Sequence, residues 1–174
     1  METEVINEKE PALVGAESQQ QAPAISHLQR REIQAPIAAC LIHGFADALG
    51  EAKALKTATA AIREDARKSG QVMAEKLGAN TLEALRQVVN EVWAEGGAVS
   101  IRMLEASDCK LSFDVTRCCY AEMYDAMAMK DLGFCLSCSR DESFASGFNP
   151  RIHLTRNQTI MQGAPYCDFR FTLA

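Results

Sequence analysis

The chain has 174 residues and a formal net charge of −5 at pH 7, with 48% hydrophobic and 24% charged residues. This composition is ordinary for one folded domain, and it excludes a wholly disordered chain, a collagen and a coiled-coil rod. No apolar run of about 18 residues occurs and the acidic N-terminus lacks the features of a secretory signal, so we expect a soluble, cytoplasmic protein.

The charge is distributed unevenly along the chain. Residues 1–26 carry five Glu residues against Lys9 alone, and they are rich in Gln, Ala and Pro, which predicts a disordered leader. Residues 27–174 are nearly neutral, and they lack the basic surface that binds nucleic acid or anionic lipid. We therefore expect a single domain over 27–174 whose partner is a small molecule, with no nucleic acid and no membrane.

Residues 27–97 have the pattern of helices. Ser26 and Gln29 have the spacing of a capping box, and Pro36 is expected to start the first helix or kink it. A second helix is expected to run from Leu55 past Gly70 as far as Gly78, and a third to open at Asn80. The first helix has an apolar stripe that recurs every four residues and is suited to a core or to a homo-oligomer interface: Ile33, Ile37, Leu41, Phe45 and Leu49.

Residues 98–174 change to the period of strands. Alternating apolar residues on both sides of Ser107 and Asp108 predict an antiparallel hairpin. Helical spacing returns over 119–130 and again over 132–146, closed by Gly147, and two further strands begin at Ile152 and Cys167. The fold class predicted is α+β, with N-terminal helices packed on a C-terminal antiparallel sheet that carries one or two inserted helices.

The cysteines indicate where the chemistry lies. In a reducing cytosol we expect free thiols, metal ligands or a nucleophile rather than a disulfide framework. A structural zinc site would need a second well-spaced pair beside Cys135 and Cys138, and none is present. One of the seven cysteines is Cys40, and the other six follow residue 108: Cys109, Cys118, Cys119, Cys135, Cys138 and Cys167.

Polar side chains are concentrated over residues 138–170. Asp168 and Arg170 share one face of the last strand, while Cys167 lies on the other face with the aromatic residues. The pattern is equally compatible with a functional site and with a solvated sheet face. His153 is the histidine near this cluster, but no G-x-S-x-G elbow and no glycine-rich phosphate loop accompanies it, which argues against a serine hydrolase and against nucleotide chemistry.

Several ordered motifs together resemble the L-2-amino-thiazoline-4-carboxylic acid hydrolase family. They are residues 117–124 (RCCYAEMY), 136–141 (LSCSRD), 147–150 (GFNP), 154–164 (LTRNQTIMQGA) and 167–171 (CDFRF), with residues 30–33 (RREI) as a weaker match. The resemblance implies a hydrolase that opens a cyclic isothiourea: water adds at the carbon between ring nitrogen and sulfur, the carbon–sulfur bond breaks, and N-carbamoyl-L-cysteine is formed.

The resemblance also implies roles for individual residues. Cys118, Cys138 and Cys167 are the family's thiols, and a thiolate at Cys138 or Cys118 is suited to covalent attack if a neighbouring cation lowers its pKa. Asp141 or Asp168 is suited to act as the general acid or the general base. The substrate-binding candidates are Arg156 or Arg170 for the substrate carboxylate, and Asn149, Thr159 and His153 for the ring.

Three alternatives stay open at this point. No cofactor is required by a cysteine mechanism, but a divalent metal held by Cys118, Cys138 and Cys167 would supply activated water instead. The same pocket would also serve a non-catalytic ligand-binding module. In the third alternative the three thiols hold a metal for stability alone.

Overall fold

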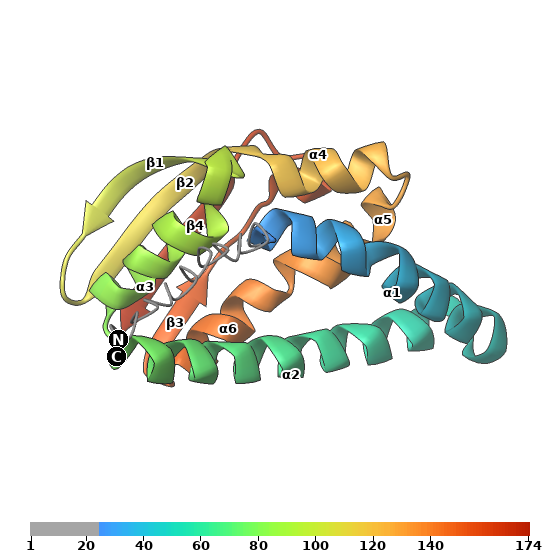
Figure 1. Cartoon of the computed structure of the whole chain (residues 1–174), viewed down its shortest axis with the longest axis horizontal. Coiled ribbons are helices and arrows are strands. Elements are labelled where there is room, and N and C mark those ends of the chain that lie inside the picture. Colours follow the sequence, from blue (N-terminus) through green and yellow to red (C-terminus); the bar gives the residue numbers. More distant parts are fainter. Residues whose placement is uncertain (1–24) are drawn as a thin grey trace, which may run out of the picture.

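The computed structural model describes residues 25–174, so nearly all of the predicted leader lies outside the described residues. Helices come first and a four-stranded antiparallel sheet follows, which confirms the predicted α+β class (Figure 1). The elements are α1 His27–Leu49, α2 Glu51–Leu77, α3 Leu82–Val88, the π-helical η1 Val89–Trp93, η2 Glu95–Gly97, β1 Val99–Ala106, β2 Lys110–Cys118, α4 Cys119–Ala126, α5 Lys130–Gly133, the π-helical η3 Phe134–Cys138, α6 Arg140–Phe148, β3 Ile152–Thr155, η4 Ile160–Gln162 and β4 Cys167–Leu173.

The sheet has the strand order β1-β2-β4-β3, and every neighbouring pair is antiparallel. The predicted hairpin is confirmed as β1 and β2, and β4 lies between β2 and β3. Phe113 of β2 is directly opposite Phe169 of β4, and their rings stack with centroids 4.9 Å apart. In the described part of the chain, no helix combines the length and apolar character needed to cross a membrane.

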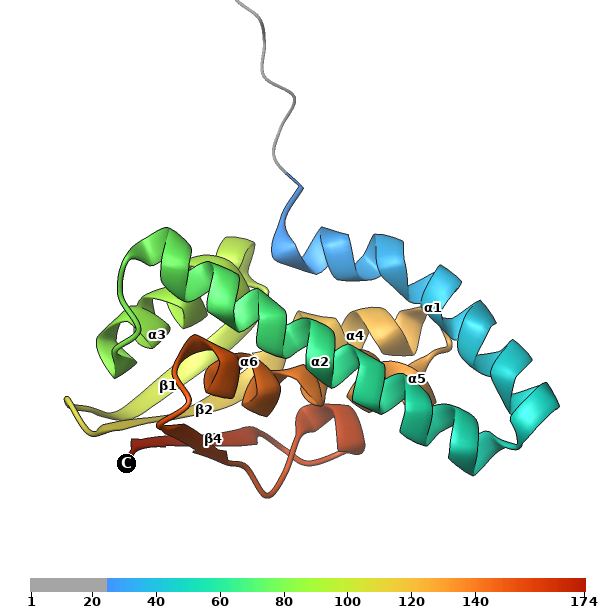
Figure 2. The same ribbon diagram turned by 90° about the horizontal axis from the view of Figure 1, so that it is seen from below.

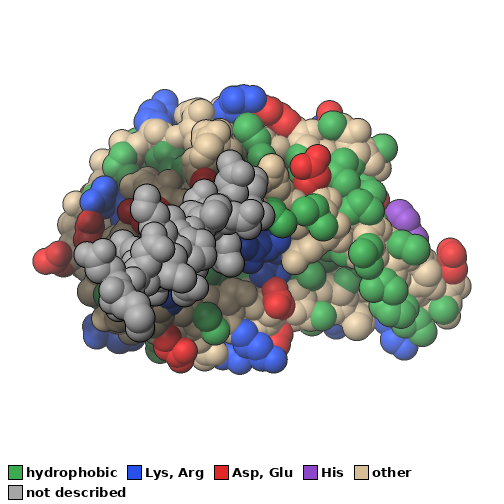
Figure 3. Space-filling view, in the orientation of Figure 1, with side chains coloured by type: hydrophobic (Ala, Val, Ile, Leu, Met, Phe, Trp, Pro, Cys, Tyr) green, Lys and Arg blue, Asp and Glu red, His purple; other side chains and the backbone are tan. Residues whose placement is uncertain are grey.

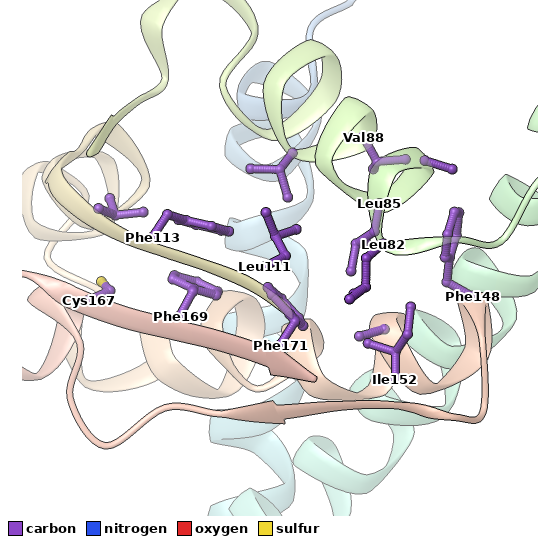
Figure 4. Packing of buried hydrophobic residues seen from close by; sticks show 14 residues of the cluster. Leu82, Leu85, Val88, Leu111, Phe113, Phe148, Ile152, Cys167, Phe169 and Phe171 are labelled. Carbon is purple, nitrogen blue, oxygen red and sulfur yellow. The ribbon is translucent and has the colours of Figure 1, made fainter. Parts of the chain in front are cut away.

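The main core lies between the inner face of the sheet and the helices (Figure 4). Leu82, Leu85 and Val88 of α3 are at most 1% exposed, and they project toward the apolar side chains of β2 and β4. Alternation along each strand places every second residue in this core. Phe148 and Ile152 close the end of the core where α6 leads into β3.

The outer face of the sheet carries an ion-pair network. Asp114 is buried between two arginines, accepting from Nη2 of Arg102 and from Nη2 of Arg170 at 2.7 Å each. The hydrogen bond from Arg102, followed by that from Arg170, holds the pKa of Asp114 below its usual value despite desolvation. Asp168 and Arg170 share this face and Cys167 faces the core, as the alternation predicts.

Helix α1 begins as predicted, and of the two uses open to its apolar stripe, the core within this chain is not the one observed. Ser26 and Gln29 form the full capping box, and the helix continues through Pro36 as one element. Its buried side chains are Ala35, Ala39 and Ile42, and the two alanines let α1 approach its neighbours closely. The apolar stripe is exposed instead, each of its five side chains by between 50% and 69%.

Several boundaries differ from the sequence prediction. The helix expected over 119–130 ends at Ala126, and the one expected over 132–146 is divided among α5, η3 and α6. The third helix is capped by Thr81, whose hydroxyl accepts from the amide of Ala84, rather than by Asn80. Gly147 does not close a helix, because α6 continues to Phe148. The second helix does end at Gly78, in the left-handed conformation that glycine favours.

Gly147 and Gly70 allow α6 and α2 to cross in close contact, and Figures 1 and 2 show the two helices lying along each other. A Cβ at Gly147 would overlap the carbonyl oxygen of Arg67, and a Cβ at Gly70 would overlap that of Phe144. Backbone therefore meets backbone at this crossing, and no flexible side-chain end is available to move aside. The crossing fixes the position of α6 above the sheet.

We predict that Gly147→Ala lowers the free energy of unfolding by roughly 1–3 kcal/mol or more, because the added methyl group separates α6 from α2. Gly44→Ala is the matched control, since a Cβ there has nothing within 4 Å and alanine favours a helix over glycine by about 1 kcal/mol. Urea unfolding followed by circular dichroism measures both. Equal stability of the two variants would contradict the close crossing.

Candidate functional site

A cavity of about 680 Å³ lies between α1, α2, η1 and α6 on one side and the inner face of β2 and β4 on the other. This volume is in the range of small-molecule binding sites. Both π-helical segments contribute to its wall, through Trp93 of η1 and Cys138 of η3. Single π turns occur frequently at functional sites, because the extra residue changes the direction of a side chain.

Three cysteines from separate parts of the chain line this cavity. Cys118 ends β2, Cys138 ends η3 and Cys167 begins β4. The Sγ atom of Cys167 accepts a hydrogen bond from the amide of Ile160 at 3.2 Å. The structure therefore brings together the three thiols that the family resemblance singles out, although they are widely spaced in sequence.

Asp141 and Arg156 form a partly buried ion pair in the same cavity. Nη1 of Arg156 donates to Oδ2 of Asp141, and Nη2 donates to the carbonyl oxygen of Cys138 at 2.8 Å. The guanidinium also lies over the ring of Phe169, 4.9 Å from its centroid. Burial raises the pKa of Asp141, and the charge of Arg156 opposes that shift.

The thiols are protonated at neutral pH. Burial raises the pKa of Cys118 to about 11 and the pKa of Cys138 further, with the charge of Asp141 adding to the shift at Cys138. Burial also raises the pKa of Cys167. Because a cation offsets such a shift, the pocket favours a thiolate only when a positive group enters it.

The other predicted site residues lie outside this cavity, and each has a local structural contact. Asp168 accepts from the amides of Asn157 and Gln158 and holds the loop after β3. Arg170 belongs to the outer ion-pair network, and His153 is exposed on β3. Two residues make further local contacts: Asn149, which donates to the carbonyl of Asn80, and Thr159, which caps η4.

The cavity also contains residues to which sequence reasoning gave no role. His27 and Arg31 of α1 line it together with Arg140 of α6, and Tyr120 of α4 bonds to the His27 ring at 2.8 Å. Burial, followed by the charge of Arg31, lowers the pKa of His27 to about 4, so its ring is neutral. The weak family match over residues 30–33 was the one signal in the sequence near this group.

Within residues 25–174, no group of three or more His, Cys, Asp or Glu side chains is arranged to hold a metal ion. The set of Cys118, Cys138 and Cys167 therefore does not form a preassembled metal centre, although all three line one cavity.

We predict that iodoacetamide at neutral pH alkylates the exposed Cys40 and Cys109 well before Cys118 and Cys138. Burial and raised pKa values keep the two cavity thiols protonated, so their alkylation rates should rise about tenfold per pH unit up to and beyond pH 9. Peptide mapping by mass spectrometry measures each rate. Rapid alkylation of Cys138 at pH 7 would contradict this description of the cavity.

Comparison with known proteins places the chain in a family. No curated protein matches it. One similar solved structure is that of a trafficking protein particle complex subunit 3 from Naegleria fowleri, covalently bound to palmitic acid. The TM-score is 0.46 and the sequence identity is 13%, and the match covers 83% of this chain and 95% of that one. The sequence model of one hydrolase family matches residues 30–171, which includes every residue placed in the cavity above except His27. The chain therefore belongs to the L-2-amino-thiazoline-4-carboxylic acid hydrolase family.

Proposed function

We propose that the protein is a hydrolase that opens a small cyclic amidine or isothiourea ring, with L-2-amino-thiazoline-4-carboxylate or a close relative as substrate. The observation that carries this proposal is the convergence of Cys118, Cys138 and Cys167 with the Asp141–Arg156 pair in one cavity. The family of the chain supports the reaction class.

Asp141 is suited to hold the amidine group of the substrate. A protonated amidine presents two parallel N–H donors, as a guanidinium does, and a carboxylate accepts both. Arg156 occupies one side of Asp141 and keeps the carboxyl group in place. The bound amidinium supplies the positive charge that the thiols otherwise lack, and it thereby favours the thiolate form of Cys138.

Cys138 is the nucleophile in this mechanism. Its sulfur bonds to the carbon between ring nitrogen and ring sulfur while its proton passes to Asp141; the ring carbon–sulfur bond then breaks, and Asp141 returns the proton to the leaving sulfur. Water next adds to the enzyme-bound carbon, the bond to Cys138 breaks and the thiol is re-formed. N-carbamoyl-L-cysteine leaves, so the net change is addition of one water.

A non-catalytic ligand-binding module is the second candidate, and the closed environment of the thiols favours it. The pKa values of all three thiols are raised, so the empty pocket holds no free thiolate. A binding protein needs no thiolate and would have the same property. The two candidates differ in turnover, because a binding module retains its ligand unchanged.

We expect wild-type protein to convert L-2-amino-thiazoline-4-carboxylate to N-carbamoyl-L-cysteine, measured by mass spectrometry, and Cys138→Ala to lower kcat by roughly a hundredfold or more. Cys109→Ala is the matched control, because that thiol is exposed in the hairpin turn outside the cavity. Intact mass of the wild type during turnover should show a covalent species heavier by one substrate.

Each negative result would reject a different part of the proposal. Absence of product from the wild type would reject this substrate, and binding without product would support the second candidate. Full activity of Cys138→Ala would reject the nucleophile. Loss of product after chelation, with the fold intact, would replace the thiol mechanism by metal-activated water.

A further inference from the structure

The outer part of the cavity holds a pair of arginines from different elements. Arg31 of α1 and Arg140 of α6 line both the main cavity and a smaller one of about 250 Å³ beside it. Figure 3 shows Lys and Arg side chains gathered in the recess at the centre of this face. Like charges that line one cavity disfavour each other, and a bound anion relieves that repulsion.

Only one of the two guanidiniums has a carboxylate partner among residues 25–174. Arg31 donates to Oε1 of Gln34 at 3.1 Å and contacts Nε2 of neutral His27 at 3.4 Å, and no carboxylate among residues 25–174 forms an ion pair with it. Arg140 is bonded to Oδ2 of Asp65 at 2.6 Å, but that carboxylate is largely in solvent. Five N–H donors per guanidinium leave several for a ligand.

We propose that Arg31 and Arg140 form an anion subsite that binds the carboxylate of the substrate and selects acidic ring compounds over neutral ones. The assignment rests on the proposed function for its substrate, and it gives the carboxylate to this pair rather than to Arg156 or Arg170. Arg156 is bonded to both Asp141 and the carbonyl oxygen of Cys138, and Arg170 lies outside the cavity. A carboxylate at Arg31 and Arg140 leaves the amidine to Asp141, which Arg156 contacts through Oδ2.

Burial and the neighbouring charge support this role. Desolvation, followed by the charge of Arg140, lowers the pKa of Arg31, so the cation is held at a cost that a bound anion would relieve. His27 stays neutral beside it, and its other ring nitrogen bonds to Tyr120. The histidine therefore orients Arg31 without adding a third charge.

The test uses a pair of probes that cannot be hydrolysed, L-thiazolidine-4-carboxylate and its carboxamide. Calorimetry on the full chain should show that the wild type binds the carboxylate roughly tenfold to a hundredfold more tightly than the amide. Arg31→Gln should bring that ratio close to one, and Arg31→Lys should retain part of it. Arg63→Gln, which removes an exposed charge of α2 outside both cavities, should leave the ratio unchanged.

The ratio separates this inference from the proposed function. A wild type without product but with a carboxylate preference that Arg31→Gln abolishes would reject the reaction and keep the subsite. No carboxylate preference in the wild type, no binding of either probe, or an unchanged ratio in both Arg31→Gln and Arg140→Gln would overturn the subsite. Thermal unfolding of each variant checks that the fold is retained.

A second observation independently concerns the apolar stripe of α1. Residues 33–46 contain no Lys, Arg, Asp or Glu, although the helix lies on the surface. Figure 3 shows hydrophobic side chains gathered over α1. By their exposed fractions, the five stripe residues present roughly 500 Å² of apolar area, so two copies would bury about 1,000 Å², which is the lower bound for a stable interface.

We infer that the occupant of this stripe is α1 of a second copy of the chain. A ridge of side chains every four residues packs into the groove beside the same ridge of an identical helix, and the two-fold axis makes the surfaces self-complementary. An uncharged stripe offers nothing for a partner of opposite charge to recognise, which favours self-association over a charged partner.

Sedimentation equilibrium of the full chain should give a dimer at micromolar concentration. Ile37→Glu and Phe45→Glu should each shift the dimer to monomer by placing a charge in the interface. Val72→Glu is the control, because Val72 is 62% exposed but lies on α2. A monomeric wild type, or a dimer that neither stripe variant weakens, would overturn the inference.

Discussion

The partly buried ion pair between Asp141 and Arg156 is the interaction on which the candidate site depends. Asp141 comes from α6 and Arg156 from the segment after β3, so the pair joins the helix above the cavity to the sheet below it. Arg156 also bonds to the carbonyl of Cys138 and lies over Phe169. Removing one partner from a fully buried pair typically costs about 3–5 kcal/mol, and the cost is smaller for this partly buried pair, in which each charge still holds the other in place. The backbone at Cys138 is held by the same arrangement.

The cavity has an inner and an outer part, and the charged groups that line them differ. In the inner part, Asp141 is paired with Arg156 and the thiols are uncharged, so a bound amidinium would add a positive charge that favours a thiolate. In the outer part, Arg31 forms no ion pair among residues 25–174, and Arg140 is paired with the largely exposed Asp65, beside neutral His27. A small molecule that carries an amidine at one end and a carboxylate at the other would suit both parts.

Much of the fold and part of the candidate site were predictable from the sequence. Alternation in the strands and the cap at Ser26 are local signals, so the elements and the inward position of Cys167 follow directly. The alternation around Arg170 is the same whether its face of the sheet is a functional site or a solvated surface. The structure distinguishes these two cases, because the helices pack on the opposite face and Arg170 is bonded to Asp114. Gly147 allows α6 to cross α2 closely, and Arg31 lies in the cavity. Both features depend on contacts between segments that are distant in the sequence, so no local pattern predicts them.

Helix α1 has two functional faces in these proposals, and they constrain each other. One face places Arg31 in the cavity, while the stripe that includes Ile37 lies in solvent. Small residues such as Ala35 and Ala39 hold the helix against the body of the protein, and small side chains bury little apolar area. The attachment of α1 is therefore weaker than its length suggests. A second copy on the stripe would restrict the motion of the helix and fix Arg31 for its anion, so association and ligand binding would stabilise the same position of α1.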